Sequence, residues 1–104
     1  MKKITYSKDD LIRKLSNKIL FSNEDMKFMV DKFFETILEI LMQPHDVVRI
    51  EIRNFGIFEV KPTKAKPKAR NPRTNEEIFV PAHKKIAFKP GKILKEELKK
   101  EWKI

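Results

Sequence analysis

The sequence has no cysteine and only two glycines, Gly56 and Gly91, among its 104 residues. Without cysteine there is neither a disulfide framework nor a thiolate metal site, which suits a reducing compartment. Two isolated glycines cannot form a glycine-rich phosphate loop. No apolar run approaches the roughly 20 residues that span a bilayer, and none follows the cations of the amino terminus. We therefore expect no secretory signal, no membrane partner and a cytoplasmic location.

Catalytic and metal-binding patterns are also missing. The chain has only two histidines, His45 and His83, and neither belongs to a cluster of ligands or to a nucleophile with its base. We interpret both as surface residues. The sequence therefore predicts no enzyme, no cofactor, no metal and no small-molecule substrate.

What the sequence does have is a cationic second half. Residues 1–60 hold ten Lys and Arg against ten Asp and Glu, whereas residues 61–104 hold fourteen against five. The net charge of +9 therefore belongs entirely to residues 61–104. Such a concentrated excess is typical of a surface that binds phosphates, whereas an evenly spread excess could serve solubility alone.

The most cationic stretch is 61–73, with sequence KPTKAKPKARNPR. It has six cations, three prolines and no acid, so it has almost nothing to bury and its charges repel one another. Two interpretations are open for the stretch by itself. It is either a disordered basic linker or a segment that a folded body holds out to meet a polyanion.

Two helices are predicted at the amino end. Ser7 and the acids after it have the form of a helix start, and apolar residues recur at helical spacing over 8–20. A second start at Ser22 opens a helix that should run to about Met42 and stop before Pro44. Apolar residues cover far more of this second helix than one stripe. We therefore expect a partner subunit to cover it.

Strand patterns follow. Apolar and charged residues alternate loosely over 47–53, which is a strand pattern. The Asn54–Gly56 segment suits a tight turn, and residues 57–60 should return as the second strand of a hairpin. Residues 76–80 and 84–88 also have strand character, so the basic stretch lies between strands. That placement favours a projecting two-stranded ribbon over a linker. A last helix should begin at Pro90, whose fixed φ suits a first turn, and carry Ile93, Leu94, Leu98 and Trp102.

Three blocks of sequence, NFGIF at 54–58, ARNPRT at 69–74 and AFKPGKILK at 87–95, together resemble the bacterial HU and integration host factor (IHF) family of DNA-bending proteins. The resemblance covers nearly the full chain, and three blocks in order are far more specific than a lone Arg-Asn-Pro. The chain departs from the family pattern at Asn75, where glycine is common. It also has Pro62 and Pro67 in a slightly longer arm, so we expect irregular pairing there.

The resemblance implies an α+β fold in which two chains intertwine as a dimer. A single domain over 1–104 would divide into a helical dimerisation base (1–44), saddle strands (45–60 and 84–89), a DNA-embracing β-ribbon arm (61–83) and a carboxy-terminal helix (90–101). The expected partners are double-stranded DNA and a second subunit, with a homodimer preferred to a heterodimer. The implied setting is the bacterial nucleoid.

The resemblance also assigns roles to residues. Pro72 would wedge between base pairs from the minor groove, with Arg70 and Asn71 beside it. The predicted DNA contacts are Lys61, Lys64, Lys66, Lys68, Arg70, Asn71, Pro72 and Arg73 on the arm, and Arg53, Asn54, Lys84, Lys85, Lys89, Pro90, Gly91 and Lys92 on the body. The predicted dimer interface is Phe33, Phe34, Ile37, Leu38, Leu41, Phe55 and Phe58. The phenylalanines are interpreted as core residues rather than base-stacking ones, because stacking would need them exposed beside cations.

Other functions remain open. Minor-groove edges distinguish mainly A·T from G·C, so we expect little sequence specificity in a chromosome-compacting protein. An IHF-like assembly factor that prefers particular sequences is one alternative. A basic module for RNA or for protein partners is another, although the wide, shallow minor groove of A-form RNA gives a thin arm less to grip.

Overall fold

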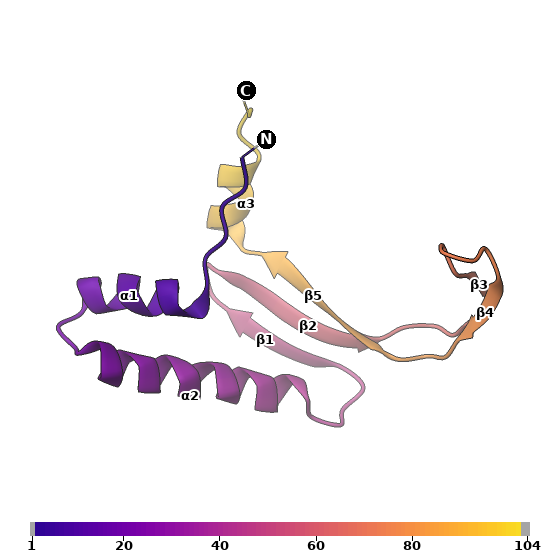
Figure 1. Cartoon of the computed structure of the whole chain (residues 1–104), viewed down its shortest axis with the longest axis horizontal. Helices are drawn as coiled ribbons and strands as arrows, with labels where there is room; N and C mark the ends of the chain where they lie inside the picture. The colour runs from indigo at the N-terminus through magenta and orange to yellow at the C-terminus, as the bar shows by residue number, and fades with distance from the viewer. Residues whose placement is uncertain (1, 103–104) are drawn as a thin grey trace. The chain divides into compact units, whose positions relative to one another are not determined.

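The structure, a computed structural model, describes residues 2–102. Its elements are α1 (Lys8–Lys18), α2 (Asn23–Leu41), β1 (Val48–Ile52), β2 (Gly56–Pro62), β3 (Lys66–Arg70), β4 (Glu77–Val80), β5 (Lys84–Pro90) and α3 (Lys92–Leu98) (Figure 1). The chain divides into two compact units, the first over residues 1–40 and the second from residue 41 onward. None of the described helices is long and apolar enough to cross a membrane.

Helix α1 begins with the predicted cap. The Ser7 hydroxyl accepts from the Asp10 backbone N–H at 3.2 Å, and the Asp10 carboxylate accepts from the Ser7 N–H at 2.9 Å. The helix ends at Lys18, two residues earlier than predicted, because Ile19 adopts an extended conformation (φ −125°). Leu20 is consequently fully exposed outside the helix.

Helix α2 buries only one stripe of its surface. Met26 and Val30 pack with Ile12 of α1 into a small core, against which Leu15 also packs. Many of the remaining large apolar side chains are exposed in the single chain, as the composition of the helix predicts, while Ile37, Ile40 and Leu41 are half-buried. Those exposed on α2 are Phe28, Met29, Phe33, Phe34 and Leu38. Such a surface is typical of a helix that a partner covers.

We expect the Ser7→Ala variant to lose about 1 kcal/mol of stability, since the α1 cap would be lost.

The Ser7 backbone N–H, followed by the Ser7 hydroxyl and Arg13, lowers the pKa of Asp10 below its ordinary value. The ionised Asp10 carboxylate therefore contributes its full stabilisation of the folded state at pH values above its ordinary pKa. That stabilisation is lost as the pH falls through the folded-state pKa. Thermal unfolding should show Asp10→Asn destabilised at neutral pH and equal to the wild type in strong acid. A difference that persists in strong acid would contradict this assignment.

The second unit contains an antiparallel three-stranded sheet with strand order β1-β2-β5. The β1–β2 turn forms as predicted, with Asn54 at φ 68° and Gly56 at φ 157°. A Cβ on Gly56 would lie 2.6 Å from the Lys89 carbonyl oxygen and from the Phe88 ring. Glycine is therefore required where β2 passes β5. Strands β2 and β5 are both longer than predicted. Strand β2 includes Gly56 and continues to Pro62, and β5 continues to Pro90.

The prediction that Pro90 opens the last helix is wrong. Pro90 is the final residue of β5, where it pairs with Gly56, and Gly91 caps α3. The reason is that β5 is an edge strand, where proline is tolerated, and that the N–H of Gly91, the next residue, donates to the Phe55 carbonyl. Helix α3 covers Lys92–Leu98 instead of 90–101, which leaves Trp102 beyond its end.

Candidate nucleic-acid interface

The strand register separates the sheet into two chemically different faces. Cross-strand partners share a face, so Val48 lies with Val60, and Ile50 with Phe58 and Phe88. The alternate residues form a second face, which we call the polar face. It consists of Arg49, Glu51, Ile57, Glu59, Lys61, Lys85, Ala87 and Lys89. Four cations from three strands therefore share one surface.

Glu59 occupies the middle of the polar face. It is only 9% exposed, and its carboxylate lies 3.2 Å from Arg49 Nε, 3.7 Å from Lys61 Nζ and 3.7 Å from Lys89 Nζ. The three cations stay about half exposed. Arg49 is also 3.4 Å from Glu51. The polar face is thus an ionic network around one nearly buried acid.

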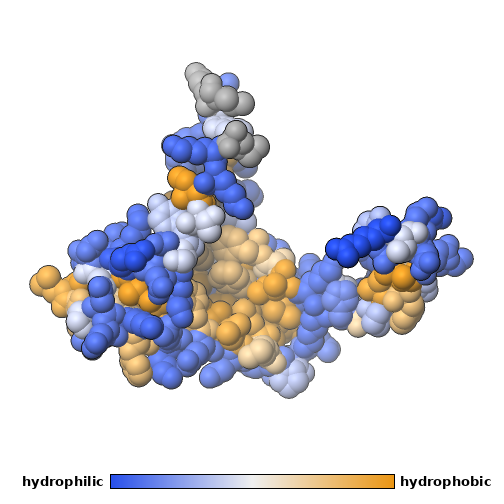
Figure 2. Space-filling model, viewed as in Figure 1, coloured by the Kyte–Doolittle hydropathy of each residue, from blue (hydrophilic) through white to orange (hydrophobic). Residues whose placement is uncertain are grey.

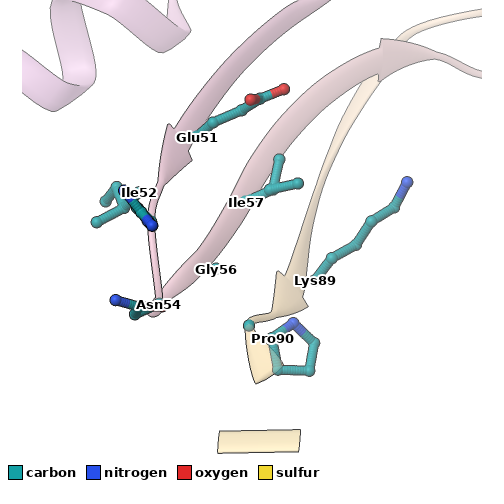
Figure 3. A pocket seen from close by; sticks show the side chains of 9 residues that line it. Glu51, Ile52, Asn54, Gly56, Ile57, Lys89 and Pro90 are labelled. Carbon is teal, nitrogen blue, oxygen red and sulfur yellow. The ribbon is translucent and has the colours of Figure 1, made fainter. Parts of the chain in front are cut away.

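At the β1–β2 turn the sheet holds a hollow of about 380 Å³. Figure 3 shows Glu51, Ile57 and Lys89 projecting to the same side from three neighbouring strands. The Gly91 N–H donates to the Phe55 carbonyl at 2.8 Å, which joins the start of α3 to the turn. Five of the predicted site residues line this hollow together, namely Arg53, Asn54, Lys89, Pro90 and Gly91.

The basic stretch forms an arm beyond the sheet. Strands β2 and β5 run on from the sheet into the segments that carry β3 and β4 (Figure 1). Strands β3 and β4 pair antiparallel as a separate ribbon. The pairing of β3 with β4 confirms the prediction that the basic stretch belongs to a two-stranded ribbon rather than to a disordered linker. The arm cations Lys64, Lys66, Lys68, Arg70 and Arg73 are all exposed.

The tip of the arm is a turn built by Asn71 and Asn75. The Asn71 N–H donates to the Glu76 carbonyl at 2.9 Å, and its side-chain oxygen accepts from the Arg73 N–H at 3.0 Å. Asn75 takes the left-handed conformation (φ 59°) in place of glycine and donates to the Asn71 carbonyl at 2.7 Å. Pro72 is exposed on this turn. Asn71 therefore holds the turn that presents Pro72.

The strand pairing of the arm is irregular at its prolines, as the sequence predicts. Pro62 is the last paired residue of β2, and the β3–β4 register shifts between Lys66 and Ala69, around Pro67. Between the two ladders the Thr63 N–H donates to the His83 carbonyl at 2.7 Å, and the Thr63 hydroxyl donates to the same oxygen at 3.0 Å. His83 is exposed, as expected, but it also joins the sheet to the ribbon.

The arm holds a second hollow, of about 280 Å³, that both apolar and cationic residues line. Ala69, Ile78 and Val80 line it together with cations of the arm and of β5. Those cations are Lys64, Lys66, Arg70 and Lys85. Figure 2 shows this part of the chain as mostly hydrophilic with one apolar patch. Ile78 and Phe79 of β4 are 40% and 65% exposed.

Lys84 lies apart from these cations. It pairs with Pro62 at the end of the ladder, and its ammonium donates to the backbone carbonyls of Gln43 and His45. Its side chain therefore holds the loop before β1, whereas the neighbouring Lys85 belongs to the polar face.

Sequence reasoning missed three residues of this surface. Glu59 falls within a strand pattern that by itself assigns it no role, although its alternation with Lys61 in β2 predicts a shared face. Thr63 and the exposed Phe79 are the other two. No local signal identifies the Thr63–His83 pair, since the two residues are 20 positions apart.

Comparisons with known proteins agree with this architecture. Residues 6–99 match the family described as bacterial DNA-binding protein. The chain is 42% identical to DNA-binding protein HU 1 of Bacillus subtilis over 90 residues, covering 86% of this chain and 94% of that protein. It is 34% identical to integration host factor subunit alpha of Hydrogenovibrio crunogenus over 92 residues, covering 88% and 91%.

A solved structure is similar throughout. The Anabaena HU–DNA cocrystal structure has a TM-score of 0.78 and 27% identity, covering 92% of this chain and all of that one. The arm ribbon, the capped helices and the three motif blocks therefore belong to one known architecture. The chain is a member of the bacterial DNA-binding protein family, the family of HU and integration host factor.

Proposed function

We propose that this protein is an architectural protein that binds and bends double-stranded DNA through the minor groove, with little sequence specificity. The observation that carries the proposal is the exposed cationic arm with Pro72 at its tip, joined to a sheet with a cationic face. The protein acts without catalysis or a cofactor, as a homodimer in the bacterial nucleoid. Its similarity to HU proteins and to an HU–DNA cocrystal supports this function.

Phosphate neutralisation supplies the affinity. The arm offers exposed cations with few acids, and the hollow at the β1–β2 turn offers Arg53, Asn54 and Lys89 beside the start of α3. Each phosphate contact releases counterions, so affinity falls steeply as salt rises. The contacts that we propose are Lys61, Lys64, Lys66, Lys68, Arg70 and Arg73 of the arm, with Arg53, Asn54, Lys85, Lys89, Pro90, Gly91 and Lys92 of the body.

Deformation of the duplex supplies the bend. A wedge between base pairs costs a few kcal/mol of unstacking per step, which the added contacts of a bent duplex offset. Proline suits this task because its ring is rigid and apolar and has no N–H to leave unpaired. In our proposal Asn71 and Asn75 fix the turn, and Pro72 enters the stack.

Dimerisation follows from the exposed apolar surface of the single chain. Phe33 and Leu38 of α2 are 57% and 55% exposed, and Phe55, which contacts Phe58 and Phe88, is 52% exposed. Such large apolar side chains belong in a subunit interface rather than in water. We propose Phe33, Phe34, Ile37, Leu38, Leu41, Phe55 and Phe58 as members of that interface.

The test is a comparison of binding to random-sequence duplex, nicked duplex and duplex RNA at several salt concentrations. We expect salt-dependent binding to random duplex, tighter binding to the more easily bent nicked duplex, and much weaker binding to RNA. Equal affinity for RNA and DNA would overturn the proposal in favour of an RNA-binding module. Strong preference for one DNA sequence would instead support an IHF-like assembly factor. Sedimentation of the free protein checks the dimer.

A further inference from the structure

Glu59 is the single buried charged side chain in the described range 2–102. It lies at the centre of β2, the middle strand, and faces the side of the sheet that carries the cations. Each strand contributes one of its ionic partners, Arg49 from β1, Lys61 from β2 and Lys89 from β5. A single carboxylate thus collects cations from the full width of the sheet.

The arrangement places the acid and its partners at different depths. The Glu59 side chain is 12% exposed, whereas the Arg49, Lys61 and Lys89 side chains are 44%, 55% and 56% exposed. The three cations are therefore accessible from solvent while they are paired with the less exposed Glu59 carboxylate. A phosphate that approaches the polar face would meet donors that Glu59 already holds.

A phosphate at this face must be bound in one of two ways, and both are opposed by Glu59. If the cations turn to the phosphate, they leave a nearly buried carboxylate without partners, which is strongly unfavourable. If they stay between the two anions, the carboxylate repels the phosphate across a short distance. The arm differs, because none of its cations Lys64, Lys66, Lys68 and Arg73 forms an ion pair with a described acid.

We propose that Glu59 restrains the affinity of the polar face for DNA phosphates by competing for Arg49, Lys61 and Lys89. This inference rests on the proposed function and deepens it. The arm beyond Lys61 binds phosphates without such competition, so Glu59 limits the contribution of the sheet alone. It also sets how strongly that contribution responds to salt.

The direct test is the Glu59→Gln variant, which keeps the side-chain shape and removes the charge. For each additional phosphate that the polar face then binds, we expect affinity for random-sequence duplex to rise about five- to tenfold near 0.1 M salt. The slope of log K against log salt should steepen by about 0.9 for each additional phosphate. Weaker binding, or an unchanged slope in a folded variant, would overturn the proposal.

Glu51→Gln is the matched control. Glu51 lies on the same face, loses the same charge and pairs with the same Arg49, but its side chain is 64% exposed and its described ion pair is with Arg49 alone. Its substitution should change affinity and slope by less than half as much as that of Glu59. Equal effects would mean that net charge alone acts, which would also overturn the proposal.

A second comparison avoids any dependence on the folding of the Glu59 variant. Lys85 and Lys89 both lie on β5 and on the polar face, but only Lys89 is paired with Glu59. Lys85→Ala should reduce the salt slope by about 0.9 per subunit, whereas Lys89→Ala should reduce it clearly less. Equal losses would contradict the competition. A wild type without salt-dependent DNA binding would instead overturn the proposed function itself.

Discussion

The Pro72→Ala variant is expected to bind DNA at low salt almost as tightly as the wild type but to bend it far less. Pro72 is exposed at the arm tip and carries no charge, so its loss removes no phosphate contact. What is lost is the apolar wedge, which in minor-groove binders kinks the duplex by about 20–90°. Alanine is too small to hold two base pairs apart. The turn itself should survive, because Asn71 and Asn75 hold it with their backbone and side-chain hydrogen bonds.

Energy transfer between dyes at the two ends of a short duplex would measure the bend. Pro67→Ala is the matched control, since Pro67 is an exposed proline of the same arm but lies in β3, away from the tip. We expect its bend to equal that of the wild type. An unchanged bend in the Pro72 variant, with intact binding, would remove the wedge from the mechanism.

Replacing Lys64, Lys66 and Lys68 together with alanine should weaken binding to all DNA sequences alike. All three are exposed and lie on the arm before its tip. Each lost phosphate contact reduces the slope of log K against log salt by about 0.9, so three lost contacts reduce it by about 2.7 per arm. The measurement is fluorescence anisotropy of labelled duplexes of several sequences across a range of salt concentrations.

Two controls separate the arm contacts from net charge. Changing the same three lysines to arginine keeps the charge and should keep the slope nearly unchanged. Removing three exposed lysines elsewhere, at positions 2, 3 and 18, lowers the net charge equally and should have a much smaller effect. If the alanine triple keeps the wild-type slope, these lysines do not contact phosphates.

Features that depend on neighbouring residues were predictable. The Ser7–Asp10 cap and the left-handed conformations of Asn54 and Asn75 occur where the sequence places them. Each depends on side chains within a few positions, so a short window contains the needed chemistry. The strands on either side of the basic stretch likewise predicted a ribbon, and the excess of apolar residues on α2 predicted the surface that one chain leaves exposed.

Features that depend on strand register were not predictable. Pro90 has a fixed φ that suits both a helix start and a strand end, and only the pairing of β5 with β2 selects the strand. The same register decides that Lys85 lies on the polar face while Lys84 binds the carbonyls of the loop before β1. A shift of one residue would exchange these roles.

The sequence by itself determined the location of the charge, the caps and turns, and the presence of an arm. These follow from composition and from contacts between close neighbours along the chain, whereas the position of Pro72 near the arm tip was implied by the resemblance to HU and integration host factor. Only the tertiary structure decided which cations share a face, that Glu59 lies nearly buried beneath three of them, and that Thr63 and His83 join the sheet to the ribbon. Those contacts join residues that are 2 to 30 positions apart in the chain, and pairing between strands sets the longer ones.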